Sequence, residues 1–191
     1  MKEKVLYQTL QDRGNIKEIL DDAPYLCNWE NTWLGKGFYF WDTFIDIAHW
    51  WGKIRYKKNY IICRFICEYD ISKCFDLVGE TDHMIDFSKA IDFLKQKKLV
   101  DENTTVSRVI SFMRNSGSFN YEAIRVFGIN SIDNTKCLNR RFVYRIMFEK
   151  DKIQYLDYKP AIQICIFEKT GLNLSKASIE FPAEYIPGYL I

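Results

Sequence analysis

The stretch GKGFYFWDTFIDIAHWW, residues 35–51, changes its hydrophobic period halfway along, and this change limits the folds open to the chain. Residues 35–41 read as a turn into a strand, with Phe38 and Phe40 on one side of a sheet and Tyr39 on the other. Apolar residues then recur at helical spacing, namely Phe44, Ile47, Ala48 and Trp51. Asp42 is expected to cap that helix. A strand followed directly by a helix favours a fold that mixes both kinds of element.

Apolar patterns elsewhere predict further short strands and helices. Strands are expected at residues 4–10, 60–69, 74–77, 122–128, 140–148 and 161–167. Helices are expected at 14–23 and, as a pair, at about 81–115, where Asp101 or Asn103 is expected to cap the second helix. Because no repeat, linker or low-complexity segment interrupts the 191 residues, the pattern predicts one α+β domain over residues 1–191.

Composition and charge exclude several classes of protein. The net charge of +2 is too small to predict nucleic-acid binding from bulk electrostatics. No apolar run approaches the ~20 residues that span a membrane, and residues 1–10 lack the apolar core of a signal peptide, so we expect a cytoplasmic protein without a membrane partner. No CxxC pair is present among the six cysteines, and no metal is expected. A zinc site at Cys63, Cys67, Cys74 and His83 is a weaker alternative.

The glycines of GKGFYF match neither of the common phosphate-binding loops. A Walker loop needs a hydroxyl residue after its lysine, but Lys36 stands between Gly35 and Gly37. A dinucleotide-binding G-x-G-x-x-G needs a third glycine where this chain has Phe40. The two glycines therefore predict a turn that needs positive φ or the close approach of another group. Two interpretations of Tyr39 stay open, a half-buried sheet residue or a residue that faces a cleft.

GKGFYFWDTFIDIAHWW resembles the strand–turn–helix of the poly(ADP-ribose) polymerase-like ADP-ribosyltransferases, which reads much like GKGIYFAD. The resemblance implies an ADP-ribosyltransferase-like fold with NAD as co-substrate. It implies that Tyr39 stacks on the nicotinamide ring and that the turn of Gly35 and Gly37 allows close approach to NAD.

Two further family signatures have imperfect counterparts in this chain. The family motif Y-H-G-[ST] corresponds to Tyr7, Gln8 and Thr9, so Gln8 stands where a histidine binds the NAD ribose. The strand AIQICIFE places Gln163 at the position of the family's catalytic glutamate. The resemblance implies that Tyr39, Gln163 and Gln8 carry catalysis and that Tyr7, Gln8, Thr9, Gly35, Gly37 and Tyr39 bind NAD. Glu168 and Glu184 are alternative acids.

Three hypotheses about function follow. The chain is also similar to small bacterial proteins of this fold, several groups of which are toxins or defence effectors, with the helices at 81–115 as an insertion. The first hypothesis is an ADP-ribosyltransferase that modifies an unknown protein, nucleic-acid or small-molecule acceptor, with a possible antitoxin partner. The second is a catalytically silent module that binds NAD, ADP-ribose or a protein, because glutamines replace two signature residues. The third is an unrelated α+β enzyme or interaction protein.

Overall fold

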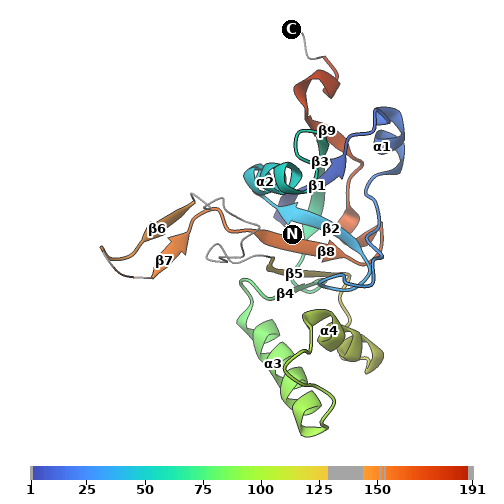
Figure 1. Cartoon of the computed structure of the whole chain (residues 1–191). Coiled ribbons are helices and arrows are strands. Elements are labelled where there is room, and N and C mark those ends of the chain that lie inside the picture. Colours follow the sequence, from blue (N-terminus) through green and yellow to red (C-terminus); the bar gives the residue numbers. More distant parts are fainter. Residues whose placement is uncertain (1, 129–143, 151, 153, 189–191) are drawn as a thin grey trace.

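The structure is a computed structural model that describes residues 2–128, 144–150, 152 and 154–188. Its main sheet contains β1 (Lys2–Gln11), β2 (Phe38–Asp42), β3 (Tyr60–Tyr69), β4 (Cys74–Asp76), β5 (Ala123–Phe127), β8 (Ile162–Ile166) and β9 (Ser178–Phe181). These strands run in the order β4-β5-β8-β2-β1-β3-β9 (Figure 1). All neighbours are antiparallel except β4 and β5. The described helices include α1 (Ile16–Asp22), α2 (Ile45–Arg55), α3 (Thr81–Gln96) and α4 (Val106–Asn115). The expected α+β class with a mixed sheet is confirmed.

The longest strand pair, β1 with β3, lies near the centre of this sheet. The β3 sequence YIICRFICEY combines β-branched and aromatic residues, which favour an extended backbone. It pairs with β1 over ten residues, from Lys2 opposite Tyr69 to Gln11 opposite Tyr60. The neighbouring residues Ile61 and Ile62, which point to opposite faces, are both fully buried. The apolar run of β3 therefore arises because the sheet is covered on both faces.

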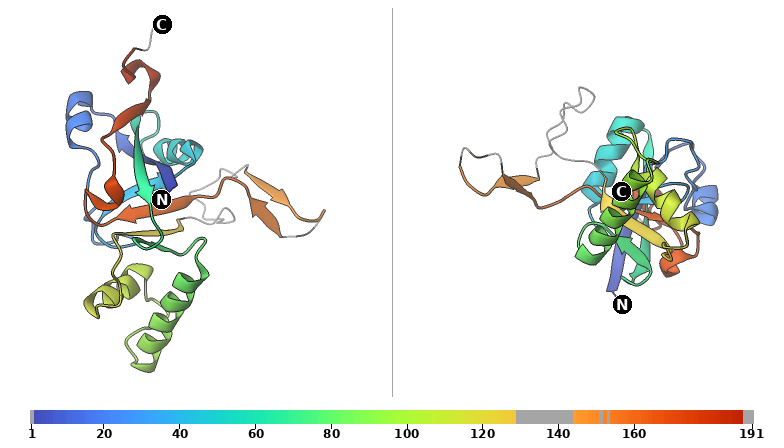
Figure 2. Two further views of the ribbon diagram at one scale, coloured as in Figure 1. Left: turned by 180° about the vertical axis from the view of Figure 1, so that it is seen from behind. Right: turned by 90° about the horizontal axis from the view of Figure 1, so that it is seen from below.

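Separate apolar cores cover the two faces. On the first face, Leu6, Phe40 and Ile164 pack beneath α1. On the second face, α2 packs over β1, β2 and β3 around Trp41. The helical pair α3 and α4, expected at 81–115, packs against the β4–β5 end of the second face around Phe75 (Figures 1 and 2). Helices on both faces leave little of the sheet open, so a ligand site must lie at a strand end or between helices.

Both expected helix caps are wrong. Asp42 does not cap α2, whose N-cap position is Phe44, because Asp42 is the last residue of β2 and its carboxylate pairs with the partly buried cations of Lys4 and Arg125. Thr43 next to it has a φ of 68°, a conformation that a β-branched residue rarely adopts, and this kink delays the helix. α4 is capped by Thr105, whose hydroxyl accepts a hydrogen bond from the Arg108 N–H, and not by Asp101 or Asn103.

A two-stranded arm extends away from the sheet in the views of Figures 1 and 2. It consists of β6 (Arg145–Met147) and β7 (Tyr155–Asp157). The strand expected at 140–148 is thus shorter, and residues 140–143 lie outside the described part of the chain. Lys159, beyond β7, lies 2.8 Å from Asp46 of α2, so the base of the arm is tied to that helix. Among the described helices, none combines the length and the apolar character needed to cross a membrane.

Candidate ligand-binding site

Strand register separates the expected site residues between the two faces. Tyr7 lies opposite Trp41, and Trp41 lies opposite Gln163. Because side chains alternate along a strand, Thr9 and Tyr39 share this second face with Tyr7 and Gln163, whereas Gln8 points to the first face. The structure therefore brings four of the expected side chains to one face and leaves Gln8 on the other.

Gln8 forms a bridge to the backbone of Tyr25. Its Nε2 donates to the Tyr25 carbonyl oxygen at 3.1 Å, and its Oε1 accepts from the Tyr25 N–H at 2.9 Å. The residue is 7% exposed. Both ends of the amide are thus engaged, and Gln8 holds the segment after α1 against β1.

Replacing Gln8 by alanine should lower the free energy of unfolding by about 1–3 kcal/mol, because the Tyr25 N–H and C=O would lose their buried partner. Urea denaturation measures this change. Glu3→Ala, at an exposed position of the same strand, is the matched control and should change stability little. A Gln8→Ala protein as stable as the control would contradict the bridge.

The Tyr39 hydroxyl is held by the turn that precedes its strand. It donates to the Gly35 carbonyl oxygen at 2.7 Å and accepts from the Leu34 N–H at 2.9 Å. Burial raises the pKa of Tyr39 far above its ordinary value, so the hydroxyl stays protonated. The ring packs against the core beneath α3 and α4. Of the two interpretations of Tyr39, these contacts favour the half-buried sheet residue.

The two glycines of the motif serve different purposes. Gly35 has a φ of 92°, which glycine adopts without strain. A Cβ on Gly37 would lie 2.5 Å from the Cys165 Sγ and 2.9 Å from the Ile166 carbonyl oxygen. Gly37 also exchanges backbone hydrogen bonds with Cys27. The group that closely approaches Gly37 is therefore strand β8, and the contact is one of core packing.

Gln163 lies beside a cluster of tryptophans. Trp41, its direct neighbour on β2, is 6.3 Å from the ring of Trp50 and 6.1 Å from that of Trp51, both on α2. The Oε1 atom of Gln163 is closed to water and finds no hydrogen-bond partner among the described residues. A buried polar atom without a partner is costly, so a ligand or a rearrangement that gave the Gln163 Oε1 atom a hydrogen bond would be favoured.

A hollow of about 310 Å³ lies at the end of β1. It is bounded by the strand end, the turn into α1, the loop that follows α1 and the last turn of α2, with lining residues Leu10, Gln11, Arg13, Asn15, Glu18, Ile19, Tyr25, Trp29, Arg55 and Tyr56. Its volume is at the lower end of small-molecule sites. Sequence reasoning missed this hollow, because no spacing links residues 10–29 to Arg55 and Tyr56. The signal that was present is Trp29, a large aromatic residue in a polar loop.

Cations and an aromatic ring meet in this hollow. The Arg55 guanidinium carbon lies 5.5 Å from the centre of the Trp29 ring, which is 66% exposed. Arg13 donates through Nε and Nη2 to the Gln11 Oε1 at 3.3 and 3.2 Å. Its Nη1 makes no hydrogen bond with another residue in the described part of the chain. Guanidinium groups suit phosphates and indole rings suit flat bases, and the Glu18 carboxylate in the same lining suits a hydrogen-bond donor.

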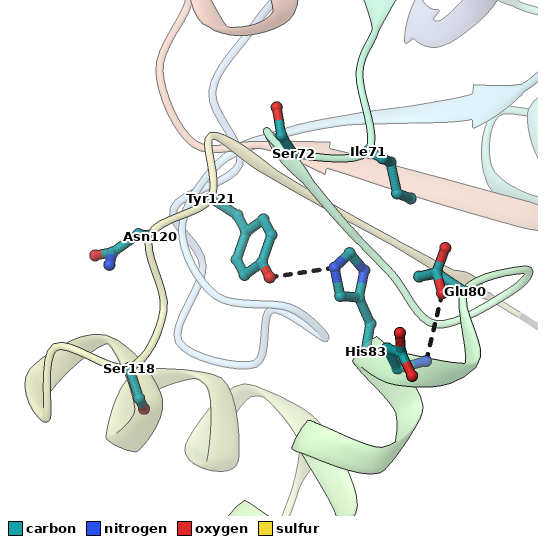
Figure 3. A pocket seen from close by; sticks show the side chains of 8 residues that line it. Ile71, Ser72, Glu80, His83, Ser118, Asn120 and Tyr121 are labelled. Atoms are coloured by element: carbon teal, nitrogen blue, oxygen red, sulfur yellow. Dashed lines mark hydrogen bonds between the residues drawn. The ribbon is translucent and has the colours of Figure 1, made fainter.

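A second hollow, of about 520 Å³, lies between the β3–β4 loop, the start of α3 and the segment after α4 (Figure 3). Its charged rim consists of Glu80 and Asp82, and no lysine or arginine lines it. His83 accepts from the Asp76 N–H through Nδ1 at 2.9 Å, and its Nε2 lies 3.1 Å from the Tyr121 hydroxyl. This histidine joins β4 to α3. The two carboxylates of the rim would repel a phosphate.

Cysteines on the first face are part of the core. Cys63, Cys67 and Cys74 are fully buried there, whereas His83 stacks on Phe75, which lies on the second face. Burial raises the pKa of Cys63 to about 12 and, more than any charge, that of Cys67 to about 11. Within the described ranges no three histidine, cysteine, aspartate or glutamate side chains gather around a possible metal position.

An ion network on the first face joins β1, β2, β4 and β5. Arg125 Nε donates to the Asp42 Oδ2 at 2.6 Å, and its Nη1 donates to the Asp76 Oδ2 at 2.9 Å. Lys4 Nζ lies 3.1 Å from Asp42, and the Tyr69 hydroxyl donates to Asp76. The Asp42 and Asp76 side chains are 1% and 6% exposed. Because every charge in this network has a partner, the network offers no free group to a ligand.

Comparison with known proteins leaves the chain without a family assignment: no family model matches it, and neither a curated protein nor a solved structure matches it significantly.

Proposed function

We propose that the protein is an ADP-ribosyltransferase-like protein that binds NAD, with the ADP half of NAD in the hollow at the end of β1. The observation that carries this proposal is the meeting of Arg13, Arg55 and Trp29 in one hollow. Two guanidinium groups match a diphosphate, and the indole offers a stacking surface to a base. The hollow begins at Leu10, next to the strand segment Tyr7–Thr9 to which the family resemblance assigns the NAD ribose.

Contacts at the signature positions favour a reader of NAD or ADP-ribose over an enzyme. Gln8 and the Tyr39 hydroxyl are both bound to backbone. The row Tyr7, Trp41 and Gln163 contains no carboxylate. Negative charge opposite a developing oxocarbenium ion is the main stabilising influence in such a substitution, and this row lacks it.

Transfer of ADP-ribose is the second candidate function, and it is favoured by the buried Oε1 of Gln163, which has no hydrogen-bond partner among the residues that the structure describes. In this reaction the bond from the anomeric carbon to nicotinamide breaks, and a nucleophile of the acceptor forms the new bond and releases its proton. Gln163 would orient the ribose 2′-hydroxyl, and catalysis would come from positioning. The acceptor, an antitoxin partner and a role as a bacterial toxin or defence effector belong to this candidate.

Arg55→Met should weaken the binding of both NAD and ADP-ribose by about tenfold or more, because a charge-assisted hydrogen bond to phosphate is lost. Isothermal titration calorimetry of the purified chain measures this change. Arg108→Met, at an exposed position of α4 that does not line the hollow, is the matched control and should bind like the wild type. Equal losses in both variants would contradict the assigned phosphate site, and failure of the wild type to bind either ligand would overturn both candidate functions.

Release of nicotinamide separates the two candidates. Wild-type protein and Gln163→Ala are incubated with NAD labelled on the adenylate and a cell lysate. A reader binds NAD and releases no nicotinamide. Release that depends on Gln163, with label on an acceptor, establishes the transferase instead.

A further inference from the structure

We infer that the hollow at the end of β1 selects its nucleotide by the base, accepting a ring with an exocyclic amino group and rejecting one with a keto oxygen there. Asn15 is the specificity-determining residue, and Tyr25 assists it. This inference rests on the proposed function for the phosphate and ring contacts, but its evidence lies in different side chains.

The orientation of the Asn15 amide follows from its neighbour. Its Nδ2 donates to the Glu18 Oε2 at 2.9 Å. A carboxylate oxygen can only accept, so the NH2 group must face Glu18 and the Oδ1 atom must face away from it. This Oδ1 is closed to water and has no hydrogen-bond partner within the described part of the chain. Asn15, which lines the hollow, therefore holds a fixed acceptor beneath its surface that no described residue uses.

Tyr25 supplies a second unused oxygen in the same wall. Its hydroxyl is also closed to water, and its polar neighbour among the described residues is the Glu18 carboxylate, at a geometry poorer than that of an ordinary hydrogen bond. The Gln8 amide fixes the Tyr25 backbone, so the ring is held at the hollow. Burial, and then the nearby Glu18 carboxylate, raise the pKa of Tyr25, so the hydroxyl keeps its proton. Glu18 attracts that proton, which leaves the oxygen lone pairs for a donor from the ligand.

Two acceptors beside a carboxylate match an aromatic amine. An exocyclic amino group has two N–H donors, and in the proposed complex one bonds Asn15 and the other bonds Tyr25. A keto oxygen in the same place would face Asn15 Oδ1 with lone pair against lone pair. Tyr25 could rotate its hydroxyl to donate to a keto oxygen, but Asn15 cannot turn without losing its bond to Glu18.

Because the two acceptor oxygens are closed to water, a base can reach them only if the hollow opens further. Both atoms lie under the surface of the hollow, so the side chains around Tyr25 must part to admit the edge of a ring. Partnering two buried polar atoms favours that opening, because each is otherwise left without a hydrogen bond. In the proposed complex the base of the nucleotide lies against the exposed Trp29 side chain, and the phosphates of the nucleotide bind Arg13 and Arg55.

The test compares two pairs of ligands that differ only in the base. The full chain is titrated calorimetrically with NAD and with nicotinamide hypoxanthine dinucleotide, and separately with adenosine and inosine monophosphates. Wild type should prefer the amino base in each pair by about tenfold or more, since a site built to bond a donor rejects the analogue without it. Asn15→Ala should bring the ratio close to one, and Tyr25→Phe should lower it partially. Asn28→Ala, an exposed amide in the same loop, should leave it unchanged.

Each outcome decides one proposal. Equal affinities of the wild type for the two bases, or an unchanged ratio in a folded Asn15→Ala protein, would overturn the base selection. Preference for the adenosine monophosphate without any binding of NAD would retain the base selection and overturn the proposed function. Binding of none of the four ligands would overturn both. Circular dichroism shows whether each variant is folded. If Asn15→Ala is unfolded, Tyr25→Phe, which removes only an oxygen, takes its place in the test.

Discussion

Replacing Arg125 by methionine should lower the free energy of unfolding by about 3–5 kcal/mol, the usual cost of removing one partner from a buried ion pair. Arg125 is the cation shared by Asp42 on β2 and Asp76 on β4, at 2.6 and 2.9 Å. Without it, Asp76 keeps the Tyr69 hydroxyl and two backbone N–H donors but loses its cation, and Asp42 keeps Lys4 and the Thr43 hydroxyl. Two nearly sealed carboxylates would then repel each other or take up protons.

Urea denaturation of wild type and Arg125→Met measures the change, with Lys89→Met as the control, because Lys89 belongs to an exposed pair with Asp86. Arg125→Lys keeps the charge, but its single ammonium group cannot bond both carboxylates as the planar guanidinium group does. We therefore expect a stability between those of wild type and Arg125→Met. A loss below about 1 kcal/mol in Arg125→Met, similar to that of an exposed pair, would show that the network adds little.

The pH dependence of stability provides a second measurement of the same network. Burial raises the pKa of Asp42, but the Thr43 hydroxyl, Lys4 and Arg125 outweigh burial and hold that pKa below its usual value. Burial likewise raises the pKa of Asp76, and Tyr69, backbone N–H groups and Arg125 outweigh it. A carboxyl with a depressed folded-state pKa contributes stability above its unfolded pKa of about 3.9, and this contribution disappears as pH falls through the folded-state value. Wild type should therefore lose stability below about pH 4, and Arg125→Met should lose less.

Gly37→Ala should destabilise the protein by about 3 kcal/mol, at the upper end of the usual cost of overpacking a core. The added methyl group would lie 2.5 Å from the Cys165 Sγ and 2.9 Å from the Ile166 carbonyl oxygen. The second of these atoms is backbone, so β2 and β8 must move apart. Both strands carry residues of the central core, which loses packing when they separate.

Gly35→Ala is the matched comparison, because nothing lies within 4 Å of a Cβ there and the cost is the strain of a positive φ, about 1–2 kcal/mol. Thermal and urea unfolding measure both variants. Adding Cys165→Ala to Gly37→Ala should recover part of the loss, since the sulfur contact disappears while the Ile166 contact stays. Equal effects of the two glycine variants would contradict the close approach of β8 at Gly37.

The expected elements emerged from the sequence where local pattern decides structure. The apolar alternation in residues 35–41 and the helical spacing after Phe44 predicted β2 and α2. The predicted cap of α2 was wrong because the sequence does not show whether an aspartate before a helix bonds a helix N–H or a cation from a distant part of the chain. Lys4 and Arg125, the residues that engage Asp42, stand 38 and 83 positions away.

Faces and neighbours needed the tertiary structure. Alternation alone predicts that Gln8 and Tyr7 point to opposite faces, but only the register of β1 against β2 decides which of them shares a face with Tyr39. That register made Gln8 a bridge to Tyr25 rather than a neighbour of Gln163. Likewise, the local sequence predicted the turn at Gly35 and the strand that follows it. The contact that requires a glycine at position 37 comes from β8, more than a hundred residues later in the chain.

The sequence by itself determined the α+β class and most of the main strands and helices. The tertiary structure alone decided the candidate site, because its hollow joins the loop around Trp29 to Arg55 at the far end of α2. Hydrophobic period reports which side of an element is buried, and this depends on neighbours within a turn or a strand pair. A ligand site depends on which unrelated segments the packed core brings together, and no local spacing records that.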